Sequence, residues 1–576
     1  MFLIARSAAW IALTGLLSLL LSAPAFAGPP VMPPPFAPDQ VVVVFQPGTA
    51  AADKRAAHSQ AGSRVIRTIP TLNAALVSVP ANSVQATIDR YGKNPNVRYA
   101  EPNFYRTFVI PDEGQEPPPP DGVGDYFKEQ WGLHNSGQGF GAMLDPITLQ
   151  LIAPLYNGLA DADIDAPEGW DGFLASCPDA ASCPPSRIAI LDSGVECAHV
   201  DLNCDYDVNL VAGIGAPNGD LIGHGTHVAG IAAARFNNDI GVSGVAINSP
   251  VGSFKVCYGY PISFPTVGVC ESVAIAEAVN LATQLGYDVI NMSFGGPTIS
   301  QAEQDAISQA SSQGVVMIGA GGNDYRNGCD YPGMLSEVIA VGASDHFDNL
   351  SSFSNFGNCI SLLAPGSESF ATYPSAGCGI APDDPLGCYT WQSGTSMAVP
   401  LVSGAAALLK TLLGGSADNQ QIRTLLENNA DSVGTLGQNM LAWSQFGRLN
   451  LANAVNGAGG QPPPSNDALY VWDIQFSLKG KTLNTSVYIK WDSDGDGIAE
   501  ASDAPASGAT LSVSMCSIFG CNFEGSQGTT DGNGKAVYKL RNPQPTSYTF
   551  TVQDIQLAPY SYSPAMDQNN PASYQP

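Results

Sequence analysis

Three short segments of the chain carry an aspartate, a histidine and a serine, in that order. Asp192 follows an apolar run in AILDSG, His224 opens the small-residue segment GHGTHVAG, and Ser396 lies in SGTSMAVP. A serine hydroxyl becomes a nucleophile when a histidine takes its proton and a carboxylate holds that histidine in place. The order differs from that of the α/β-hydrolases, in which the serine comes first. The three segments therefore predict acyl-transfer chemistry at Ser396.

Each of these residues also has a purely structural interpretation. An aspartate at the end of a strand often forms a turn or caps a helix, and Ser396 by itself is a candidate N-cap. His224 and His227 have the i, i+3 spacing of a metal-binding pair, but no third ligand is evident in the sequence. We expect His227 to be packed rather than catalytic. The occurrence of all three segments in one chain favours catalysis.

Apolar strand patterns alternate with helical patterns between residues 126 and 456. The strand candidates are 187–192, 251–257, 288–293, 315–320 and 338–343, and the helix candidates are 224–236, 271–285, 300–313, 396–413 and 418–429. Continuous apolar strands separated by helices are typical of a buried parallel sheet with helices on both faces. Such sheets carry their sites at the carboxyl ends of the strands, where Asp192 lies. We expect an α/β domain over residues 126–456.

The flanking regions have different patterns. Residues 1–27 combine Arg6, an apolar run and an A-x-A sequence, and predict a cleaved signal peptide, which leaves no stable membrane insertion. Residues 28–110 predict a small α+β unit, with strands at 40–45, within 64–79 and at 97–105, and helices at 51–61 and 81–92. A linker rich in proline and acidic residues follows at 111–125. After a second linker at 457–466, residues 467–576 predict a small antiparallel β-sandwich.

These segments resemble the subtilisin-like serine proteases of the subtilase family. Further segments extend the resemblance over residues 40–456: VMIGAGGN ends at Asn323, and NMSFG contains Ser293 to Gly295. Two departures are small: AGG replaces the usual AAG before the asparagine, and HVDL at 199–202 replaces HPDL. The resemblance implies an endopeptidase in which His224 is the base, Asp192 orients it, and Asn323 stabilises the oxyanion. It also implies that residues 28–110 form an inhibitory propeptide. A binding module with an inactive protease fold is the alternative, and an active-site titration with a fluorophosphonate separates the two.

The resemblance also implies a set of substrate-binding residues. They are Ser293, Phe294, Gly295, Ala320, Gly321 and Gly322. The three glycines would line the pocket for P1, the residue on the amino side of the cleaved bond, with little but backbone. We expect a pocket without a carboxylate on its walls, which favours large apolar P1 side chains.

Cysteine content and charge restrict the compartment and the partners. Twelve cysteines, an even number, lie mostly as near neighbours in the sequence, which favours disulfides in an oxidising compartment. Pairing of neighbours would give Cys177–Cys183, Cys197–Cys204, Cys257–Cys270, Cys329–Cys359, Cys378–Cys388 and Cys516–Cys521, although sequence alone does not determine connectivity. The net charge of −28 is unsuited to nucleic acid. We expect a secreted, extracellular monomer that acts on proteins or peptides.

One acidic segment in the C-terminal region resembles a calcium loop. Asp492, Asp494 and Asp496 stand at alternate positions, a glycine follows, and Asp503 falls at the twelfth position. Glutamate is the usual last ligand, and an acidic hairpin turn is the alternative. We expect structural Ca²⁺ here and no organic cofactor.

The predicted propeptide differs from the rest of the chain in charge. Residues 28–106 contain eight Lys or Arg and four Asp or Glu, and they contain no cysteine. A basic segment beside a strongly acidic body is expected to associate rapidly by electrostatic steering. We expect this segment to act as an intramolecular chaperone and inhibitor whose C-terminal tail lies in the active-site cleft until it is cut, in or before the 111–125 linker.

Overall fold

The computed structural model describes most of the chain between residues 32 and 459 and the strands beyond it. The described residues are 32–108, 126–140, 143–144, 151–153, 156–178, 182–211, 219–238, 240–259, 267–379, 387–414, 417–459, 468–479, 482–491, 504–505, 509–517, 520–521, 526–530, 535–541, 548–556, 561–562 and 572–574. The predicted signal peptide, the 111–125 and 457–466 linkers in all but a few residues, and the four aspartates of the predicted calcium loop lie outside these residues. The chain divides into two compact units, residues 1–166 with 184–451, and residues 167–183 with 452–576.

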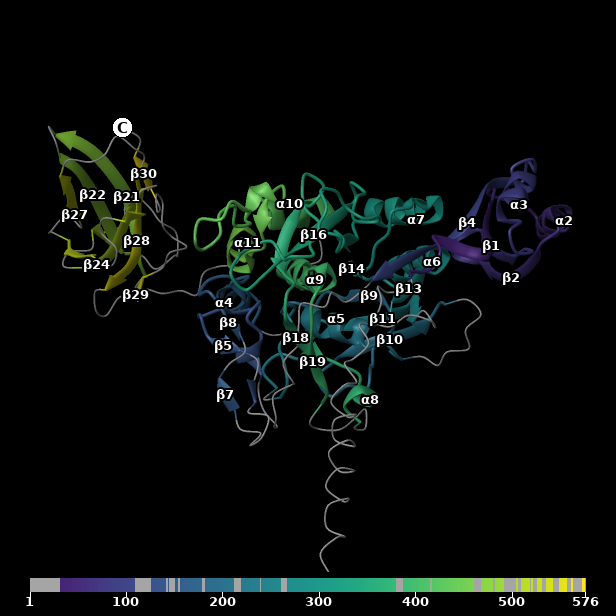
Figure 1. The fold of residues 1–576 in the computed structure, drawn as a ribbon, viewed down its shortest axis with the longest axis horizontal. Coiled ribbons are helices and arrows are strands. Elements are labelled where there is room, and N and C mark those ends of the chain that lie inside the picture. The colour runs from purple at the N-terminus through teal and green to yellow at the C-terminus, as the bar shows by residue number, and fades with distance from the viewer. Residues whose placement is uncertain are drawn as a thin grey trace, which may run out of the picture. The chain divides into compact units, whose positions relative to one another are not determined.

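An eight-stranded parallel sheet forms the centre of the first unit (Figure 1). Its strands, in spatial order, are β10 (Cys204–Asn209), β11 (Val251–Lys255), β9 (Ile188–Asp192), β14 (Val289–Met292), β15 (Val316–Ala320), β16 (Val338–Ser344), β17 (Leu362–Pro365) and β20 (Gly447–Arg448). All seven pairings between neighbours are parallel. The predicted α/β class with a parallel sheet is confirmed.

Helices cover both faces of this sheet because its strands are apolar on both sides. Ile290 and Met292 share one core cluster with α6 (Ser272–Gln284) and α7 (Gln301–Ser312). Since neighbouring side chains of a strand point to opposite faces, Val289 faces the other way, where α9 (Thr395–Leu412) packs across β14 to β17. Helix α5 (His224–Ala233) packs against α9, and α10 (Asn419–Asn428) completes this layer. These are the five helices that the sequence predicts.

Helix α9 is the one helix in the described part of the chain that is long and apolar enough to cross a membrane. Nearly all of it is buried inside the first unit. Its only cation, Lys410, is buried as well and donates a hydrogen bond to the carbonyl of Gly314 at 3.1 Å. Burial on the sheet accounts for its apolar composition.

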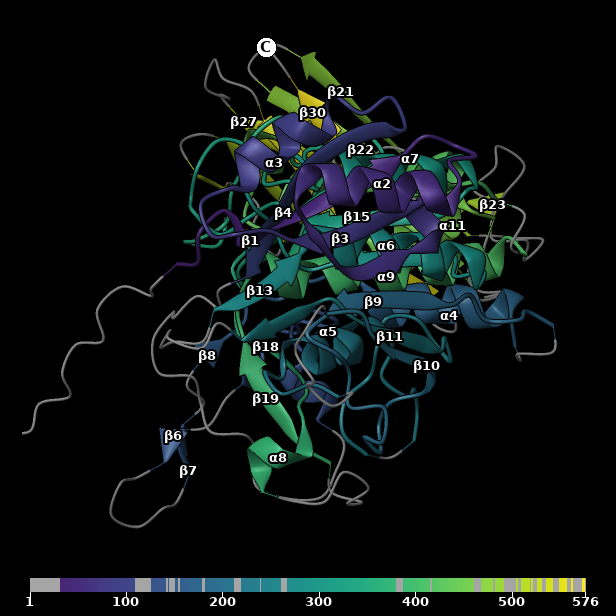
Figure 2. The ribbon, with the colours of Figure 1, turned by 90° about the vertical axis from the view of Figure 1, so that its right-hand side faces the viewer.

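A second sheet joins the predicted propeptide to the catalytic region. In spatial order its strands are β12 (Cys257–Gly259), β13 (Gly268–Glu271), β4 (Val97–Phe108), β1 (Phe36–Phe45), β3 (Ala74–Ser78) and β2 (Arg64–Ile69). Helices α2 (Ala51–Ala61) and α3 (Val84–Tyr91) pack on the propeptide part. Figure 2 shows α2 and α3 beside β1, β3 and β4, and Figure 1 shows β4 running from there toward β13. The first half of β4 pairs with β1, and its last four residues pair with β13.

Shorter elements complete the first unit. They are a hairpin of β18 (Ser369–Thr372) and β19 (Tyr389–Gln392), α8 (Ser375–Cys378), the two-stranded pairs β5 (Gly139–Phe140) with β8 (Tyr156–Asn157) and β6 (Met143–Leu144) with β7 (Leu151–Ala153), and 3-10 turns at Pro70–Leu72, Phe127–Glu129 and Met440–Ala442. The sequence analysis misses β10, β17 and β20 because two of them are short and β10 is half polar.

The second unit contains two antiparallel sheets and the helices α4 (Ala166–Ser176) and α11 (Leu451–Gly457). The first consists of β21 (Ala468–Lys479), β22 (Thr482–Trp491), β23 (Ala504–Pro505), β27 (Lys535–Arg541) and β29 (Ser561–Tyr562), with β29 pairing in parallel. The second consists of β24 (Thr510–Ser517), β25 (Gly520–Cys521), β26 (Ser526–Thr529), β28 (Tyr548–Gln556) and β30 (Ala572–Tyr574). Side chains of both sheets, among them Val487 and Phe550, form one core. This is the β-rich region that the sequence predicts.

Five disulfides link near neighbours in the described residues. They are Cys177–Cys183, Cys197–Cys204, Cys257–Cys270, Cys329–Cys359 and Cys378–Cys388. All five match neighbour pairing. For the sixth predicted pair, the backbones of Cys516 and Cys521 are opposite each other on β24 and β25, and their side chains lie outside the described residues.

Candidate active site

Asp192 and His224 meet at the carboxyl edge of the central sheet. Asp192 is the last residue of β9, and His224 is the first residue of α5. The Nδ1 atom of His224 lies 2.8 Å from Oδ1 of Asp192, and both side chains are buried. Oδ1 also accepts a hydrogen bond from the backbone N–H of Ser193 at 2.6 Å. A carboxylate in this position fixes the tautomer in which Nδ1 carries the proton and leaves Nε2 to act as the base.

Gly225 permits this close approach of helix and strand. A Cβ at residue 225 would lie 2.1 Å from the carbonyl oxygen of Gly194 and 3.0 Å from Cβ of Asp192. Any side chain here would therefore push α5 away from β9 and lengthen the contact between Asp192 and His224.

Asp220 holds the turn that leads into α5. Its carboxylate accepts hydrogen bonds from Ser193 Oγ at 2.8 Å, from the backbone N–H groups of Gly223 and Thr226, and from the Thr226 hydroxyl. The turn after Asp192 and the start of α5 are thus tied to one buried carboxylate. The sequence analysis missed Asp220 because no local motif marks it.

Ser396 lies in the first turn of α9, where the helix dipole and the free N–H groups favour negative charge. Its hydroxyl donates to the carbonyl of Ser293 at 3.1 Å, and the Ser293 hydroxyl donates to the carbonyl of Ser396 at 2.9 Å. The structure therefore places Ser293 against Ser396, the predicted nucleophile, and Ser293 is not among the residues that line the neighbouring cavity.

Asn323 lies beside Ser396 at the end of the loop after β15. Its side-chain oxygen accepts hydrogen bonds from the Thr395 N–H at 3.0 Å and the Thr395 hydroxyl at 2.8 Å. Because the amide oxygen is held by the start of α9, the amide NH₂ points the other way. Asn323 also lines the cleft next to Ser396. This orientation is the one that an oxyanion donor requires.

His227 has the packed role that the sequence predicts. Its Nε2 lies 3.1 Å from the carbonyl oxygens of both Ser369 and Thr390 on the β18–β19 hairpin. Burial lowers the pKa of His227 to about 3. The ring is therefore neutral at ordinary pH and anchors the hairpin on α5.

A cavity of about 500 Å³ opens beside Ser396. Four of the predicted substrate-binding residues line it, namely Phe294, Gly295, Ala320 and Gly322. Gly321 instead serves the backbone framework: its carbonyl accepts from Asn355 Nδ2 at 2.9 Å and from the Asp330 N–H at 2.9 Å.

The expectation of a pocket without a carboxylate is wrong. Asp324 and Asp330 both line the cavity, and Asp330 forms an ion pair with Arg326. Oδ2 of Asp330 lies between two glycines, because a Cβ would be 3.0 Å from it at Gly295 and 2.7 Å at Gly322. Burial raises the pKa of Asp330 and Arg326 lowers it. Local sequence did not show this because Asp330 is seven residues beyond Asn323 and a loop returns it to the pocket.

The last residues of β4 occupy the cleft beside His224. Thr107 and Gly295 exchange both backbone hydrogen bonds, at 2.8 and 3.0 Å. The ring of Phe108 stacks on the imidazole of His224, with centroids 3.8 Å apart and an interplanar angle of 15°. A chain segment N-terminal to the catalytic region therefore covers the base of the predicted triad.

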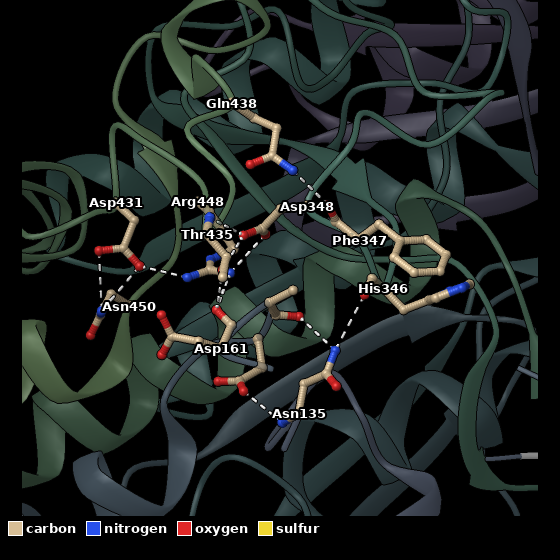
Figure 3. Close-up of polar contacts among 12 residues, drawn as sticks. Asn135, Asp161, His346, Phe347, Asp348, Asp431, Thr435, Gln438, Arg448 and Asn450 are labelled. Carbon is tan, nitrogen blue, oxygen red and sulfur yellow. Dashed lines mark hydrogen bonds and ion pairs between the residues drawn. The ribbon is translucent and has the colours of Figure 1, made fainter. Parts of the chain in front are cut away.

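A further polar cluster surrounds Arg448 (Figure 3). Arg448 donates to Asp348 at 2.7 Å, to the Asp161 carbonyl at 2.8 Å and to Asp431 at 2.8 Å. Burial by itself lowers the pKa of Arg448, but Asp348 and Asp431 raise it above its usual value. Thr435 donates two further bonds to Asp348, each of 2.9 Å.

This cluster also bears on metal binding. Subtilases commonly bind Ca²⁺, but no group of three or more His, Cys, Asp or Glu suited to a metal occurs in the residues that the structure describes. The carboxylates around Arg448 are held by that guanidinium, by Asn450 and by backbone N–H groups. The chain needs no organic cofactor for its family's chemistry.

Comparison with known proteins agrees with this geometry. Residues 186–448 match the model of the subtilase family, and residues 25–103 match the fervidolysin N-terminal prodomain. Thermitase from Thermoactinomyces vulgaris is 36% identical over 295 residues, which is 51% of this chain and 93% of thermitase. Subtilisin DY from Bacillus licheniformis is 38% identical over 252 residues, 43% of this chain and 84% of that protein. A thermophilic serine proteinase from Bacillus sp. (strain AK1) is 28% identical over 422 residues, 72% of this chain and 87% of that protein.

The chain belongs to the subtilase family. It is a serine-type endopeptidase with an N-terminal prodomain, as the sequence predicts.

Proposed function

We propose that this chain is the zymogen of a secreted endopeptidase that cleaves proteins through an acyl-enzyme on Ser396. His224 removes the proton of the Ser396 hydroxyl and later protonates the leaving amine. Asp192 orients His224 and stabilises its charged form. The side chain of Asn323 and the backbone N–H of Ser396 stabilise the oxyanion. The 2.8 Å contact between Nδ1 of His224 and Oδ1 of Asp192 carries this proposal.

Residues 28–110 are proposed as the intramolecular inhibitor. The contacts of Thr107 with Gly295 and of Phe108 with His224 support this role, because a strand in that position blocks entry of a substrate. Cleavage in or before the 111–125 linker would then release the mature enzyme, with 126–456 as its catalytic domain and 467–576 as a C-terminal β domain.

For the P1 side chain we propose a preference for large apolar residues. Phe294, Ala320 and the backbone of Gly295 and Gly322 supply an apolar slot. The ion pair with Arg326 offsets the charge of Asp330 at its wall. A series of peptides that differ at P1 alone measures the preference: kcat/KM should be highest for Phe or Leu, and a maximum at Glu or Asp contradicts it.

We further propose that the protein is extracellular and monomeric. We also propose that it binds Ca²⁺ through Asp492, Asp494, Asp496 and Asp503. The disulfides are consistent with an oxidising compartment. Calorimetry of the secreted protein with Ca²⁺ tests the metal, and the absence of heat at millimolar Ca²⁺ contradicts it.

A fluorophosphonate titration tests the central claim. The processed protein should bind one equivalent on Ser396, located by mass spectrometry of the labelled peptide. A protein that cleaves nothing and remains unlabelled would instead be a binding module with an inactive protease fold.

A further inference from the structure

Arg106, near the end of β4, has a fully buried side chain that contacts the catalytic region. Its guanidinium forms a two-point ion pair with Glu303 on α7, with Nε–Oε2 at 3.2 Å and Nη2–Oε1 at 3.1 Å. Both side chains are fully buried. The guanidinium carbon lies 4.6 Å from the centre of the Tyr331 ring. We call the Glu303 carboxylate and the Tyr331 ring the Glu303 pocket.

The Glu303 pocket is suited to an arginine in both charge and shape. A planar guanidinium matches a carboxylate at two points and stacks on an aromatic ring, which an ammonium group does less well. Burial raises the pKa of Glu303 to about 7, while Arg106 lowers it. A buried carboxylate is costly unless a cation pairs with it. The pocket therefore discriminates strongly in favour of an arginine.

The catalytic region holds the Glu303 pocket in place by its own contacts. Ser300 caps α7 and accepts a hydrogen bond from the Glu303 N–H at 3.3 Å. The Tyr331 hydroxyl donates to the Ser300 carbonyl at 3.1 Å. In the S-x-x-E pattern of Ser300 to Glu303, the glutamate side chain normally turns back to the N-cap. Here it instead bonds a residue of the strand in the cleft.

The strand that carries Arg106 lies where a substrate strand would lie. Thr107 pairs with Gly295, and two residues before Gly295 the Ser293 carbonyl accepts the hydroxyl of Ser396. A substrate strand would run antiparallel to residues 293–295, so its residue two places after the partner of Gly295 lies opposite Ser293. Because Ser293 contacts the hydroxyl of Ser396, this residue is the one next to the cleaved bond, P1. The partner of Gly295 is then P3, and the residue in the position of Arg106 is P4.

We propose that the Glu303 pocket, once the propeptide has left, binds an arginine at P4, so that the mature protease selects proteins with arginine three residues before P1. This inference rests on the proposed function and adds a substrate class to it. The propeptide uses the same pocket through Arg106, so inhibitor and substrate compete for one guanidinium site.

Peptide substrates that are identical except at P4 test this inference on the processed wild-type enzyme. We expect kcat/KM for Arg to exceed that for Ala by about tenfold or more, because the pair is shielded from solvent. Lys should fall between them, since it cannot bind at two points, and Glu should be lowest. Equal kcat/KM for Arg and Ala overturns the proposal and needs no variant.

Glu303→Gln keeps the size of the side chain and removes its charge. The ratio of kcat/KM for P4 Arg to P4 Ala should fall to near one. Glu277→Gln is the matched control, because Glu277 pairs with Arg67 of the propeptide outside the cleft, and it should retain the wild-type ratio. An unchanged ratio in Glu303→Gln overturns the assignment to this pocket.

The two levels of the proposal fail in different ways. If the protein is not a protease, no peptide is cleaved and the fluorophosphonate labels nothing. If only the P4 inference is wrong, labelling and cleavage are normal and the Arg to Ala ratio is one. Should Glu303→Gln fail to process itself, the wild-type P4 series alone decides: a kcat/KM for Arg well above those for Lys and Ala supports the proposal, and equal values overturn it.

Discussion

The propeptide is held on the catalytic region by non-covalent contacts, whereas the catalytic region itself is cross-linked by disulfides. The propeptide has no cysteine, and it contacts the catalytic region through a shared sheet and through ion pairs from Arg67, Arg98 and Arg106. The catalytic region contains Cys257–Cys270, Cys329–Cys359 and further disulfides. Once the chain is cut between the propeptide and the catalytic region, these ion pairs and the pairing of β4 can dissociate, and dilution then separates the two parts. Disulfides persist in the product.

The comparison extends to the helix that receives the propeptide. Glu101 accepts hydrogen bonds from the Ser300 hydroxyl and from the Gln301 and Ala302 N–H groups at the start of α7. A carboxylate of the propeptide therefore stabilises this helix terminus, where the dipole favours negative charge. When the propeptide is removed, the Ser300 hydroxyl and the two backbone N–H groups at the start of α7 become free to bind water or a substrate.

The largest effect is expected from Ser396→Ala. Hydrolysis should fall by about 10⁶, and the propeptide should remain attached in cells without other proteases. Intact-mass measurement of the secreted protein reads the result. Ser308→Ala, an exposed serine on α7, is the control and should be processed normally. Normal processing of Ser396→Ala would refute the assignment of the nucleophile.

Removal of a disulfide should weaken the catalytic region strongly. Cys329 and Cys359 are 30 residues apart, and replacing both by Ala should lower the free energy of unfolding by about 2–4 kcal/mol. Denaturant unfolding in the Ser396→Ala background measures it. The pair Cys378 and Cys388, only 10 residues apart, should cost less when removed. If the protein has the same free energy of unfolding with and without Cys329–Cys359, this disulfide does not stabilise the catalytic region as we expect.

Salt should slow the binding of the propeptide to the catalytic region and should have little effect on the disulfide-linked catalytic region itself. The rate at which added propeptide inhibits the processed enzyme should fall by about tenfold between low and high ionic strength, because steering is screened. Stopped-flow inhibition kinetics measures the rate. A propeptide that does not inhibit refutes its role, whereas inhibition at a rate independent of salt refutes only the steering.

A smaller effect is expected from Asp165 in the polar cluster around Arg448. Burial, together with Asp163 and Asp431, raises the pKa of Asp165 to about 8. The folded state therefore holds a proton that the unfolded state has lost, and this contribution to stability disappears as pH rises from about 4 through about 8. Asp165→Asn should have little effect near pH 5 and should stabilise the protein at pH 9 by about 1 kcal/mol or more.

Unfolding in the Ser396→Ala background at several pH values checks this expectation. Asp89→Asn, a replacement of an exposed aspartate on α3, provides the control for a general loss of negative charge. The same stability difference at pH 5 and pH 9 for Asp165→Asn would contradict the proton assignment.

The sequence predicted many of the helices and strands because the local pattern of apolar residues matches the side chains that the fold buries. The apolar run before Asp192 became β9, and the helix predicted at 51–61 is α2 with the same bounds. The strand predicted at 97–105 extends three residues further, to Phe108. Those extra residues pair with β13, a partner more than 150 residues away, so no local pattern could show where β4 ends.

The amino-acid sequence by itself determined the class of protein and the contrast in charge, and it indicated Asp192, His224 and Ser396 as candidate catalytic residues. Such features depend on residue type and short spacing. Only the tertiary structure decided how the cysteines pair, that Asp330 lines the cavity beside Ser396, and that Arg106 is buried on Glu303. A buried charge depends on which distant segment supplies its partner, and that partner is determined by packing alone.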